Sequence, residues 1–497
     1  MMRNLQVFLS GAIAVTAFAP FNLWWMSIVS LSYCLLLFYS HPQCHAFKHG
    51  FIYGMGLFTC GISWLFYSLH DFGQAPMLVA AGMVLMLAAY LSLFPALCFF
   101  WVRKLTGLTC HHQILVLVVL WVLFEWIRSW FMTGFPWLSY GHALVDSPLR
   151  GVLPVGGTFA GSALIALCAG LIAKTILEPD TRPRTQYFLI ASLLISCWGL
   201  DFINWTHVAA AQPLKVAAVQ SNIPEFMKWK ASLRGEIYQR HADASADYLE
   251  HDVVVWPETA IPTFYRVAEQ EFISQYAHQL AAHKAEVIAG VFTHQPSTDE
   301  IYNSVVSLSD PPRFYNKQHL VPFGEYLPFS SLFYLFERFV KIPAANLSAG
   351  EGTSLMIIGQ RPVGISICYE AVFGEQILKS MPHAQWLLNI TNDAWFGPSL
   401  APHQHLQISR VRASETGRYM VRTANTGISA IIDHKGRILA RSGEFTSEVI
   451  DSEIWPMQGR TPFMIWSNWG IISTLIIVLL IVLGQHRLSH LRVKLTK

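Results

Sequence analysis

The chain has 497 residues, of which 53% are hydrophobic and only 13% charged, whereas soluble domains carry about 25% charged residues. This composition argues against an ordinary cytosolic enzyme and against a disordered chain. The formal net charge of +3 is too small to indicate nucleic-acid binding. Only 15 of the 65 charged residues lie among the first 213, so an apolar N-terminal part precedes a more polar part.

Eight apolar stretches are long enough to predict membrane helices, which need about 20 residues because lipid offers the backbone no hydrogen-bond partner. The first is expected to be a retained helix rather than a cleaved signal peptide, because Pro20 would follow the cut and apolar residues resume at Trp24. The stretches lie near residues 6–21, 23–40, 51–69, 77–101, 114–132, 155–177, 187–203 and 466–483. We therefore expect a seven-helix membrane domain over residues 1–210, and an eighth membrane helix with a cytoplasmic tail over residues 461–497.

The orientation of these helices follows from the Lys and Arg residues of short loops, which favour the cytoplasmic side. With the N-terminus inside, eleven Lys and Arg residues fall on inner segments, and only Arg128 and Arg150 fall in short outer loops. Seven crossings would then place the polar part outside the cytoplasm. That part would be tethered to the membrane at both ends.

From Leu214 onward, short apolar runs end in polar turns, which is typical of buried strands. Helical stretches at 269–284 and 403–416 lie between some of these runs, and strands that alternate with helices indicate a layered α/β domain. A hairpin is expected where 427–432 and 437–440 flank an Asp-His-Lys-Gly turn. The predicted strands are 214–219, 253–256, 287–291, 363–367 and 386–390. We expect this domain to cover residues 211–460.

Three chemically capable residues follow apolar runs or lie in polar turns of this domain, where α/β sheets usually carry their sites. Glu258 lies in W-P-E-T-A, Lys317 in Y-N-K-Q-H-L-V-P-F-G-E-Y, and Cys368 closes G-I-S-I-C-Y-E. Each alone has an ordinary explanation: a turn or cap carboxylate, a surface charge, and a buried thiol. The combination favours nucleophilic catalysis. No C-x-x-C or H-E-x-x-H spacing is present, so we expect no metal and no cofactor.

The order Glu258, Lys317, Cys368 resembles the catalytic set of the nitrilase (carbon–nitrogen hydrolase) superfamily over residues 214–455. With eight predicted spans, and with the motifs HLVPFGEYLP, ICYE and NDAWFG, the chain resembles the membrane-bound branch, the apolipoprotein N-acyltransferases. The resemblance implies an extracytoplasmic αββα sandwich beside the α-helical membrane domain. It also implies the bacterial inner membrane, with the sandwich on the periplasmic side.

In this interpretation Cys368 attacks an acyl carbonyl, Glu258 acts as general base, and Lys317 donates to the oxyanion. The backbone N–H of Tyr369 is the expected second oxyanion donor. The resemblance implies supporting roles for two carboxylates: Glu325 orients Lys317 or shuttles a proton, and Glu370 holds the loop of the nucleophile. Trp229 matches an aromatic residue that lies near the lipid site in the family. The alternative is that Trp229 only packs on the protein surface.

The resemblance implies that a phospholipid donates its acyl chain to the Cys368 thiol as a thioester. The acceptor is then the α-amine of the N-terminal S-diacylglyceryl cysteine of an apolipoprotein, so the expected partners are membrane lipids and diacylated lipoproteins, with no nucleic acid. A monomer is plausible. The alternative is a membrane-anchored amidase or nitrilase that acts on small C–N substrates, although eight spans exceed what an anchor needs. A third reading is a non-enzymatic transporter or scaffold, which the intact triad disfavours.

Two further segments are expected to serve the lipid substrate. Residues 329–342 (FSSLFYLFERFVKI) contain large apolar side chains and only three charges, which favours an arm in the membrane interface over an ordinary packed helix. The small residues of 343–352 that follow are expected to form a lid.

Overall fold

The computed structural model describes residues 1–41, 43–105, 110–178, 183–327 and 346–495. The chain divides into two compact units. The helical unit comprises Met1–Ser63, Ala80–Asn204 and Ile465–Lys497, and the sandwich unit comprises Trp64–Val79 and Trp205–Met464. The interface arm expected at 329–342 and the first three residues of the lid expected at 343–352 lie outside the described residues.

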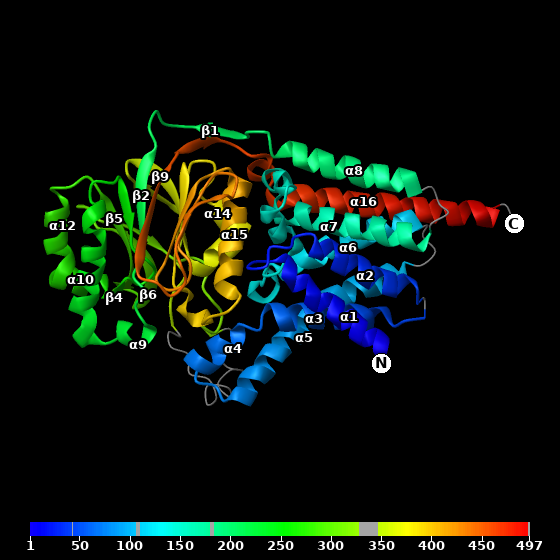
Figure 1. Cartoon of the computed structure of the whole chain (residues 1–497), viewed down its shortest axis with the longest axis horizontal. Helices are drawn as coiled ribbons and strands as arrows, with labels where there is room; N and C mark the ends of the chain where they lie inside the picture. The colour runs from blue at the N-terminus through cyan, green and yellow to red at the C-terminus, as the bar shows by residue number, and fades with distance from the viewer. Residues whose placement is uncertain (42, 106–109, 179–182, 328–345, 496–497) are drawn as a thin grey trace. The chain divides into compact units, whose positions relative to one another are not determined.

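The helical unit consists of long helices whose sequences are the apolar stretches noted above (Figure 1). Short 3₁₀ turns join several of them, at η1 (Val15–Ala17), η3 (Phe131–Thr133), η4 (Tyr140–Asp146) and η5 (Arg150–Val152). The helices are α1 (Met2–Ala14), α2 (Met26–Tyr39), α3 (Ala46–Gly61), α5 (Met77–Lys104), α6 (Cys110–Arg128), α7 (Leu153–Leu177), α8 (Pro183–Leu200) and α16 (Pro462–Leu495).

Within the described residues, three helical stretches are long and apolar enough to cross a membrane: Met77–Lys104, Arg150–Leu177 and Pro462–Gln485. The third predicted stretch, 51–69, is not one straight helix. The chain bends by 64° between Ala46–Gly61 and Leu65–Phe72, because α3 ends at Gly61 and Ile62 leaves the helical conformation. The segment after the bend, α4 (Leu65–Tyr67) with the π-turn η2 (Ser68–Phe72), belongs to the sandwich unit.

Glycines let α1 and α3 pack closely side by side. A Cβ atom added at Gly11 of α1 would collide with the carbonyl oxygen of Tyr53, and one at Gly56 of α3 would collide with the carbonyl oxygen of Phe8. Arg3 and Asn4 from the start of α1 and Lys48 and His49 from the start of α3 also line one cavity, so both helices begin at the same end of the unit. Small residues at such positions are the usual means of close approach between membrane helices.

The sandwich unit contains two large sheets. One is six-stranded, with the order β13-β12-β11-β10-β9-β8, and the other is seven-stranded, with the order β14-β2-β3-β5-β6-β7 and β4 paired to β5. A small sheet pairs β1 (Thr206–Val208) with β15 (Met457–Gly459). The strands are β2 (Leu214–Gln220), β3 (Val253–Val255), β4 (Ile261–Phe264), β5 (Glu286–Gln295), β6 (Glu300–Ser307), β7 (Arg313–Asn316), β8 (Leu355–Ile358), β9 (Arg361–Ile367), β10 (Trp386–Thr391), β11 (Met420–Ala424), β12 (Ala430–Ile432), β13 (Ile438–Arg441) and β14 (Glu448–Ile454).

Three hydrophobic layers hold this unit together. The central layer lies between the sheets, where Val216 and Val255 of one face Ile365 and Leu388 of the other. Helices α10 (Arg234–Ser245) and α12 (Ser274–Leu280) cover the outer face of the seven-stranded sheet. Helices α14 (Gly374–Leu378) and α15 (Ala401–Thr416) cover the outer face of the six-stranded sheet (Figure 1). This order of layers is the expected αββα sandwich.

The predicted strands of the polar part all form, and so do the helix at 403–416 and the terminal hairpin, β12–β13. The stretch at 269–284 differs from a regular helix. It begins as the π-turn η8 (Glu269–Ile273) and ends at Leu280 in α12. Parallel pairing joins β2 to β3, β3 to β5, β9 to β10 and β10 to β11. The buried, almost wholly apolar strands required by this arrangement account for the continuous apolar runs of the sequence.

Candidate active site

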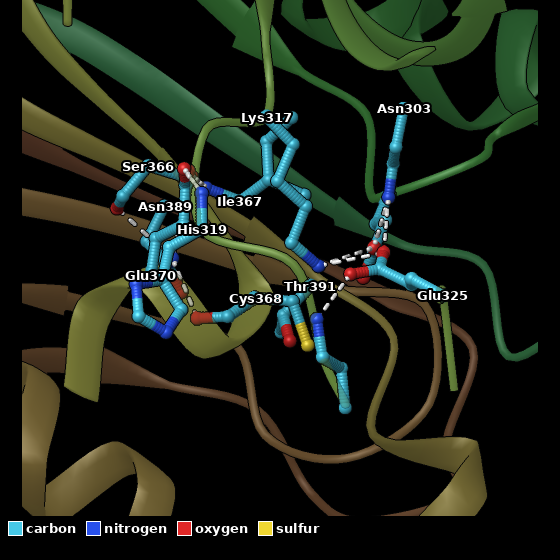
Figure 2. Close-up of polar contacts among 12 residues, drawn as sticks. Asn303, Lys317, His319, Glu325, Ser366, Ile367, Cys368, Glu370, Asn389 and Thr391 are labelled. Carbon is cyan, nitrogen blue, oxygen red and sulfur yellow. Dashed lines mark hydrogen bonds and ion pairs between the residues drawn. The ribbon is translucent and has the colours of Figure 1, made fainter. Parts of the chain in front are cut away.

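Glu258, Lys317 and Cys368 each lie just beyond the carboxyl end of a strand. Glu258 follows β3, Lys317 follows β7, and Cys368 follows β9. All three side chains are buried: Glu258 is 7% exposed, Lys317 1% and Cys368 9%. The fold therefore brings three residues that are far apart in sequence to one group of loops, where Figure 2 shows Lys317 and Cys368.

Cys368 occupies a sharp turn between β9 and the 3₁₀ helix η9 (Cys368–Val372). Its φ angle is 50°, in the left-handed region that side chains other than glycine rarely adopt. The strain of such a turn projects the side chain of a nucleophile out of the sheet. The thiol forms a hydrogen bond with the Thr391 side chain and interacts electrostatically with Glu258 and Lys317.

Lys317 is held between two carboxylates. Its Nζ lies 2.8 Å from Glu325 Oε1 and 3.9 Å from Glu258 Oε1. The side-chain amide of Asn303 also joins the two carboxylates, because its Nδ2 donates to Glu258 Oε1 at 2.7 Å and to Glu325 Oε1 at 3.3 Å. Figure 2 shows the Lys317 ammonium directed at Glu325. Lys317 is thus held in position by Glu325 and Glu258 rather than by Cys368.

The electrostatics of this cluster follow from burial. Burial raises the pKa of Glu258, although the nearby Lys317 ammonium opposes that shift. Burial raises the pKa of the Cys368 thiol, and the carboxylate of Glu258 adds to it while Lys317 opposes it. Burial alone would lower the pKa of Lys317, but Glu325 and Glu258 outweigh it and the net shift is upward. The cluster therefore combines a lysine whose positive charge is stabilised, a thiol less acidic than usual and a carboxyl group more basic than usual.

Glu370 joins the loop that follows Lys317 to the turn at Cys368. Its Oε2 accepts a hydrogen bond from the backbone N–H of Ile367 at 2.7 Å. Its Oε1 accepts from the backbone N–H of Gln318 at 2.7 Å and of His319 at 3.0 Å, and Tyr315 Oη donates to the same carboxylate. This fully buried side chain therefore fixes Lys317 relative to Cys368.

A second buried network contacts the carbonyl group of Cys368. The sequence analysis did not predict it. His405 Nε2 donates to the carbonyl oxygen of Cys368 at 3.1 Å, and Asn389 Nδ2 lies 3.4 Å from the same oxygen. His405 Nδ1 lies 3.1 Å from Asp393 Oδ1, and Arg422 donates to Asp393 Oδ2 at 2.7 Å. Burial and the adjacent Arg422 lower the pKa of His405, although Asp393 opposes that shift, and its Nε2–H serves as a structural donor to the Cys368 carbonyl.

Two further residues near Glu258 carried no recognisable motif. Lys228 is buried, and its Nζ donates to the backbone carbonyl of Glu258 at 3.0 Å. Gly290 of β5 allows the Glu258 loop to approach the sheet, because a Cβ atom there would lie 2.7 Å from the Cα of Glu258. The only signal in the sequence was a lysine and a glycine beside or within apolar segments, which did not point to this position.

The two aromatic residues singled out in the sequence occupy different settings. The ring of Tyr369 packs against Phe373, with centroids 5.0 Å apart. Trp229 is half exposed, its ring lies 5.8 Å from that of Phe292, and its indole N–H donates to Glu225 Oε1 at 2.7 Å. Glu225 in turn accepts from Asn392 Nδ2 at 3.0 Å. Trp229 is thereby connected to the NDAWFG motif.

The segment after the bend at Gly61 packs on that same motif, within the sandwich unit. Trp64 meets Phe396 at a centroid distance of 4.8 Å, and Phe72 meets Trp395 at 5.2 Å. Ser68 Oγ donates to the carbonyl oxygen of Trp395 at 2.7 Å. An aromatic layer thus covers the loop that follows β10. Among the described residues, no group of three or more His, Cys, Asp or Glu side chains is arranged to hold a metal ion.

Comparison with known proteins agrees with this architecture. Residues 10–171 match the family model described as the apolipoprotein N-acyltransferase N-terminal domain, and residues 215–459 match the carbon–nitrogen hydrolase model. The chain is 36% identical to the apolipoprotein N-acyltransferase of Methylococcus capsulatus over 477 residues, which cover 95% of this chain and 94% of that protein. It is 37% identical to the enzyme of Nitrosomonas europaea over 473 residues and 33% identical to that of Vibrio vulnificus over 483 residues, each match covering 94% of both chains. The chain therefore belongs to the apolipoprotein N-acyltransferase family.

Proposed function

We propose that this protein transfers an acyl chain from a phospholipid to the α-amine of an N-terminal S-diacylglyceryl cysteine, through a thioester on Cys368. The observation that carries the proposal is the convergence of Glu258 and Lys317 around one buried thiol in a strained turn. The relatives, which match over nearly the whole chain, bear the name of this activity.

The first half-reaction forms the thioester. Glu258 removes the proton from the Cys368 thiol as the sulfur attacks the carbonyl carbon of the lipid ester. Lys317 and the backbone N–H of Tyr369 stabilise the oxyanion of the tetrahedral intermediate. The bond from the carbonyl carbon to the glycerol oxygen then breaks, and Glu258 returns the proton to that oxygen as the lysophospholipid leaves. The raised pKa of Glu258 suits both proton transfers.

The second half-reaction regenerates the thiol. The neutral α-amine of the acceptor attacks the thioester carbonyl, a C–N bond forms, and the C–S bond breaks. Glu258 takes a proton from the amine and returns it to the sulfur. Glu325 and Glu370 keep Lys317 and the nucleophile turn in place through both steps, because they contact these elements directly. Trp229 is proposed to contact the lipid.

We also propose eight membrane crossings, with the N-terminus in the cytoplasm and the sandwich unit on the periplasmic side of the bacterial inner membrane. The strong Lys and Arg asymmetry of the loops supports this orientation. Eight helices overlap the eight apolar stretches, and three of the described helical stretches are long and apolar enough to cross a membrane. Reporter fusions after residues 105 and 213 test the topology: the first should report the cytoplasm and the second the periplasm.

The direct test of the function is detection of the thioester. Purified full-length protein is incubated with a phospholipid that carries a labelled acyl chain, and the intact mass is measured. We expect one added acyl chain, which hydroxylamine removes and which a diacylated lipopeptide accepts as an amide. Absence of the adduct from the wild-type protein, or its persistence in Cys368→Ala, would contradict the proposal. The amidase alternative is disfavoured by the match of residues 10–171 to the N-terminal domain of the family.

A further inference from the structure

A second concave site lies in the helical unit. It is a cavity of about 310 Å³ at the end of the unit where α1 and α3 both begin. Arg3, Asn4 and Val7 of α1 form one wall, and Lys48, His49 and Ile52 of α3 form the opposite wall. His41 and His45, from the connection between α2 and α3, close the rim. We call this site the basic cavity.

The basic cavity concentrates positive charge, and no carboxylate among the described lining residues balances it. Two cations, Arg3 and Lys48, line it, and among the described residues that line it none is acidic. Neither cation forms an ion pair with a carboxylate of the described chain. Arg103 also acts electrostatically on His49, a wall residue. Cations clustered at a cavity without counter-ions favour the binding of an anion.

The backbone adds donors to the same end. Helices α1 and α3 begin at Met2 and Ala46, and neither start has a side chain that caps it. The first N–H groups of any α-helix have no intrahelical acceptor, and here no capping side chain accepts from them. The positive ends of both helix dipoles therefore lie at the cavity. His49, at its floor, is held by a hydrogen bond to the carbonyl oxygen of Cys34, which fixes the shape of the site.

The apolar side chains around the cavity favour a phospholipid over a free anion as its ligand. Large apolar side chains on the first turns of α1 and α3 point away from the core: Met2 is 79% exposed, Leu5 56%, Leu9 47% and Phe47 40%. Met2 and Phe47 are the chain neighbours of Arg3 and Lys48, so exposed apolar side chains stand next to both cations. A ligand that carries a phosphate next to two hydrocarbon chains would satisfy both surfaces at once, which a soluble phosphate cannot do.

We propose that the basic cavity binds the phosphate of an anionic phospholipid, with its acyl chains along Leu5, Leu9 and Phe47. Arg3 and Lys48 bind the phosphate, and the proposed topology assigns this end of the unit to the cytoplasmic leaflet. The site lies wholly within the helical unit and shares no residue with the Cys368 cluster. It is therefore a lipid site separate from the acyl-donor site.

The test measures lipid binding to purified full-length protein in detergent by native mass spectrometry. An ether-linked phosphatidylglycerol serves as the probe, because it has no acyl ester to react with Cys368. Ether-linked phosphatidylcholine and glycerol 3-phosphate are the comparison ligands. Each cation near a lipid headgroup contributes about fivefold to affinity. We expect Lys48→Gln to weaken phosphatidylglycerol binding about fivefold, and Arg3→Gln/Lys48→Gln about 25-fold.

Lys104→Gln is the matched control, because Lys104 is an exposed lysine of the same unit that does not line the cavity. It should leave the affinity unchanged. Equal losses for K48Q and K104Q would overturn the proposal in favour of general surface attraction. Equal binding of phosphatidylcholine would overturn the charge argument, and equal binding of glycerol 3-phosphate would overturn the lipid assignment. Thioester formation by the variants, measured in parallel, should not change, and this separates the site from the catalytic proposal.

Discussion

The two charged clusters of this chain differ in how their charges are balanced. Around Cys368, each buried ion has a defined partner: Lys317 contacts Glu325 and Glu258, and Asp393 contacts Arg422. In the basic cavity, Arg3 and Lys48 line one space without a carboxylate among the described lining residues. The difference teaches that a compensated cluster is prepared for chemistry, because its groups are already held in place. An uncompensated cluster is prepared for a ligand that supplies the missing charge.

The largest effect is expected from the nucleophile. Cys368→Ser should lower turnover by at least about four orders of magnitude, because a hydroxyl is far less acidic than a thiol and is poorly activated by Glu258. The assay is transfer of a labelled acyl chain to a diacylated lipopeptide. Cys60→Ser in the helical unit is the control and should keep normal activity. Measurable turnover of Cys368→Ser near the wild-type rate would contradict the role of the thiol.

Lys317→Met should slow thioester formation by about 10²- to 10³-fold, which is the usual effect of removing one oxyanion donor. Rapid-quench measurement of the acyl adduct gives the rate, and thermal unfolding verifies that the protein remains folded. Lys284→Met, a surface lysine paired with Asp252, is the control. An unchanged rate of adduct formation would remove Lys317 from the oxyanion site.

His405→Leu should slow thioester formation by about tenfold to 10²-fold, because the carbonyl oxygen of Cys368 loses the closer of its two donors and the Cys368 turn shifts. His405→Gln is the matched variant, because its side-chain amide restores a donor at the same reach. A purely structural role would lower the melting temperature of both variants equally, without rescue of the rate by glutamine. Rescue of the rate in His405→Gln identifies positioning.

The smallest effect concerns pH. Glu258 acts as a base only when deprotonated, so thioester formation should fall as the pH drops through its raised pKa. The hydrogen bond from Asn303 lowers that pKa, and Asn303→Leu should therefore move the acid limb of the rate profile to higher pH. Single-turnover rates measured between pH 5 and 9 give the limb. A limb that stays in place or moves to lower pH would exclude Glu258 as the titrating base.

The sequence predicted those features that depend on local pattern. Continuous apolar runs identified the central strands, such as β2 and β10, because parallel strands buried on both faces carry few polar residues. The order and setting of Glu258, Lys317 and Cys368 predicted a site through resemblance, and the structure brings these three side chains together. Length and hydropathy identified the long helices, but hydropathy averages over a window and passed over the 64° bend after Gly61.

The parts that the sequence did not reveal depend on contacts between distant segments. Asn303 and Arg422 lie inside buried strands, where a polar side chain looks like an exception to the pattern rather than part of a site. His405 is a helix residue whose importance arises only because α15 packs below the Cys368 turn. A polar residue that interrupts an apolar strand is the signal that could have identified Asn303 and Arg422, since such groups require partners when buried.

The left-handed backbone at Cys368 has a consequence for how this protein can change over time. A side chain in that conformation makes the folded state less stable, by about 1–2 kcal/mol, than a glycine would. At this position catalysis therefore requires a cysteine, whereas the stability of the fold would be greater with a glycine. In a lineage no longer required to modify lipoproteins, drift toward glycine at this position would silence the enzyme and strengthen its fold in a single step.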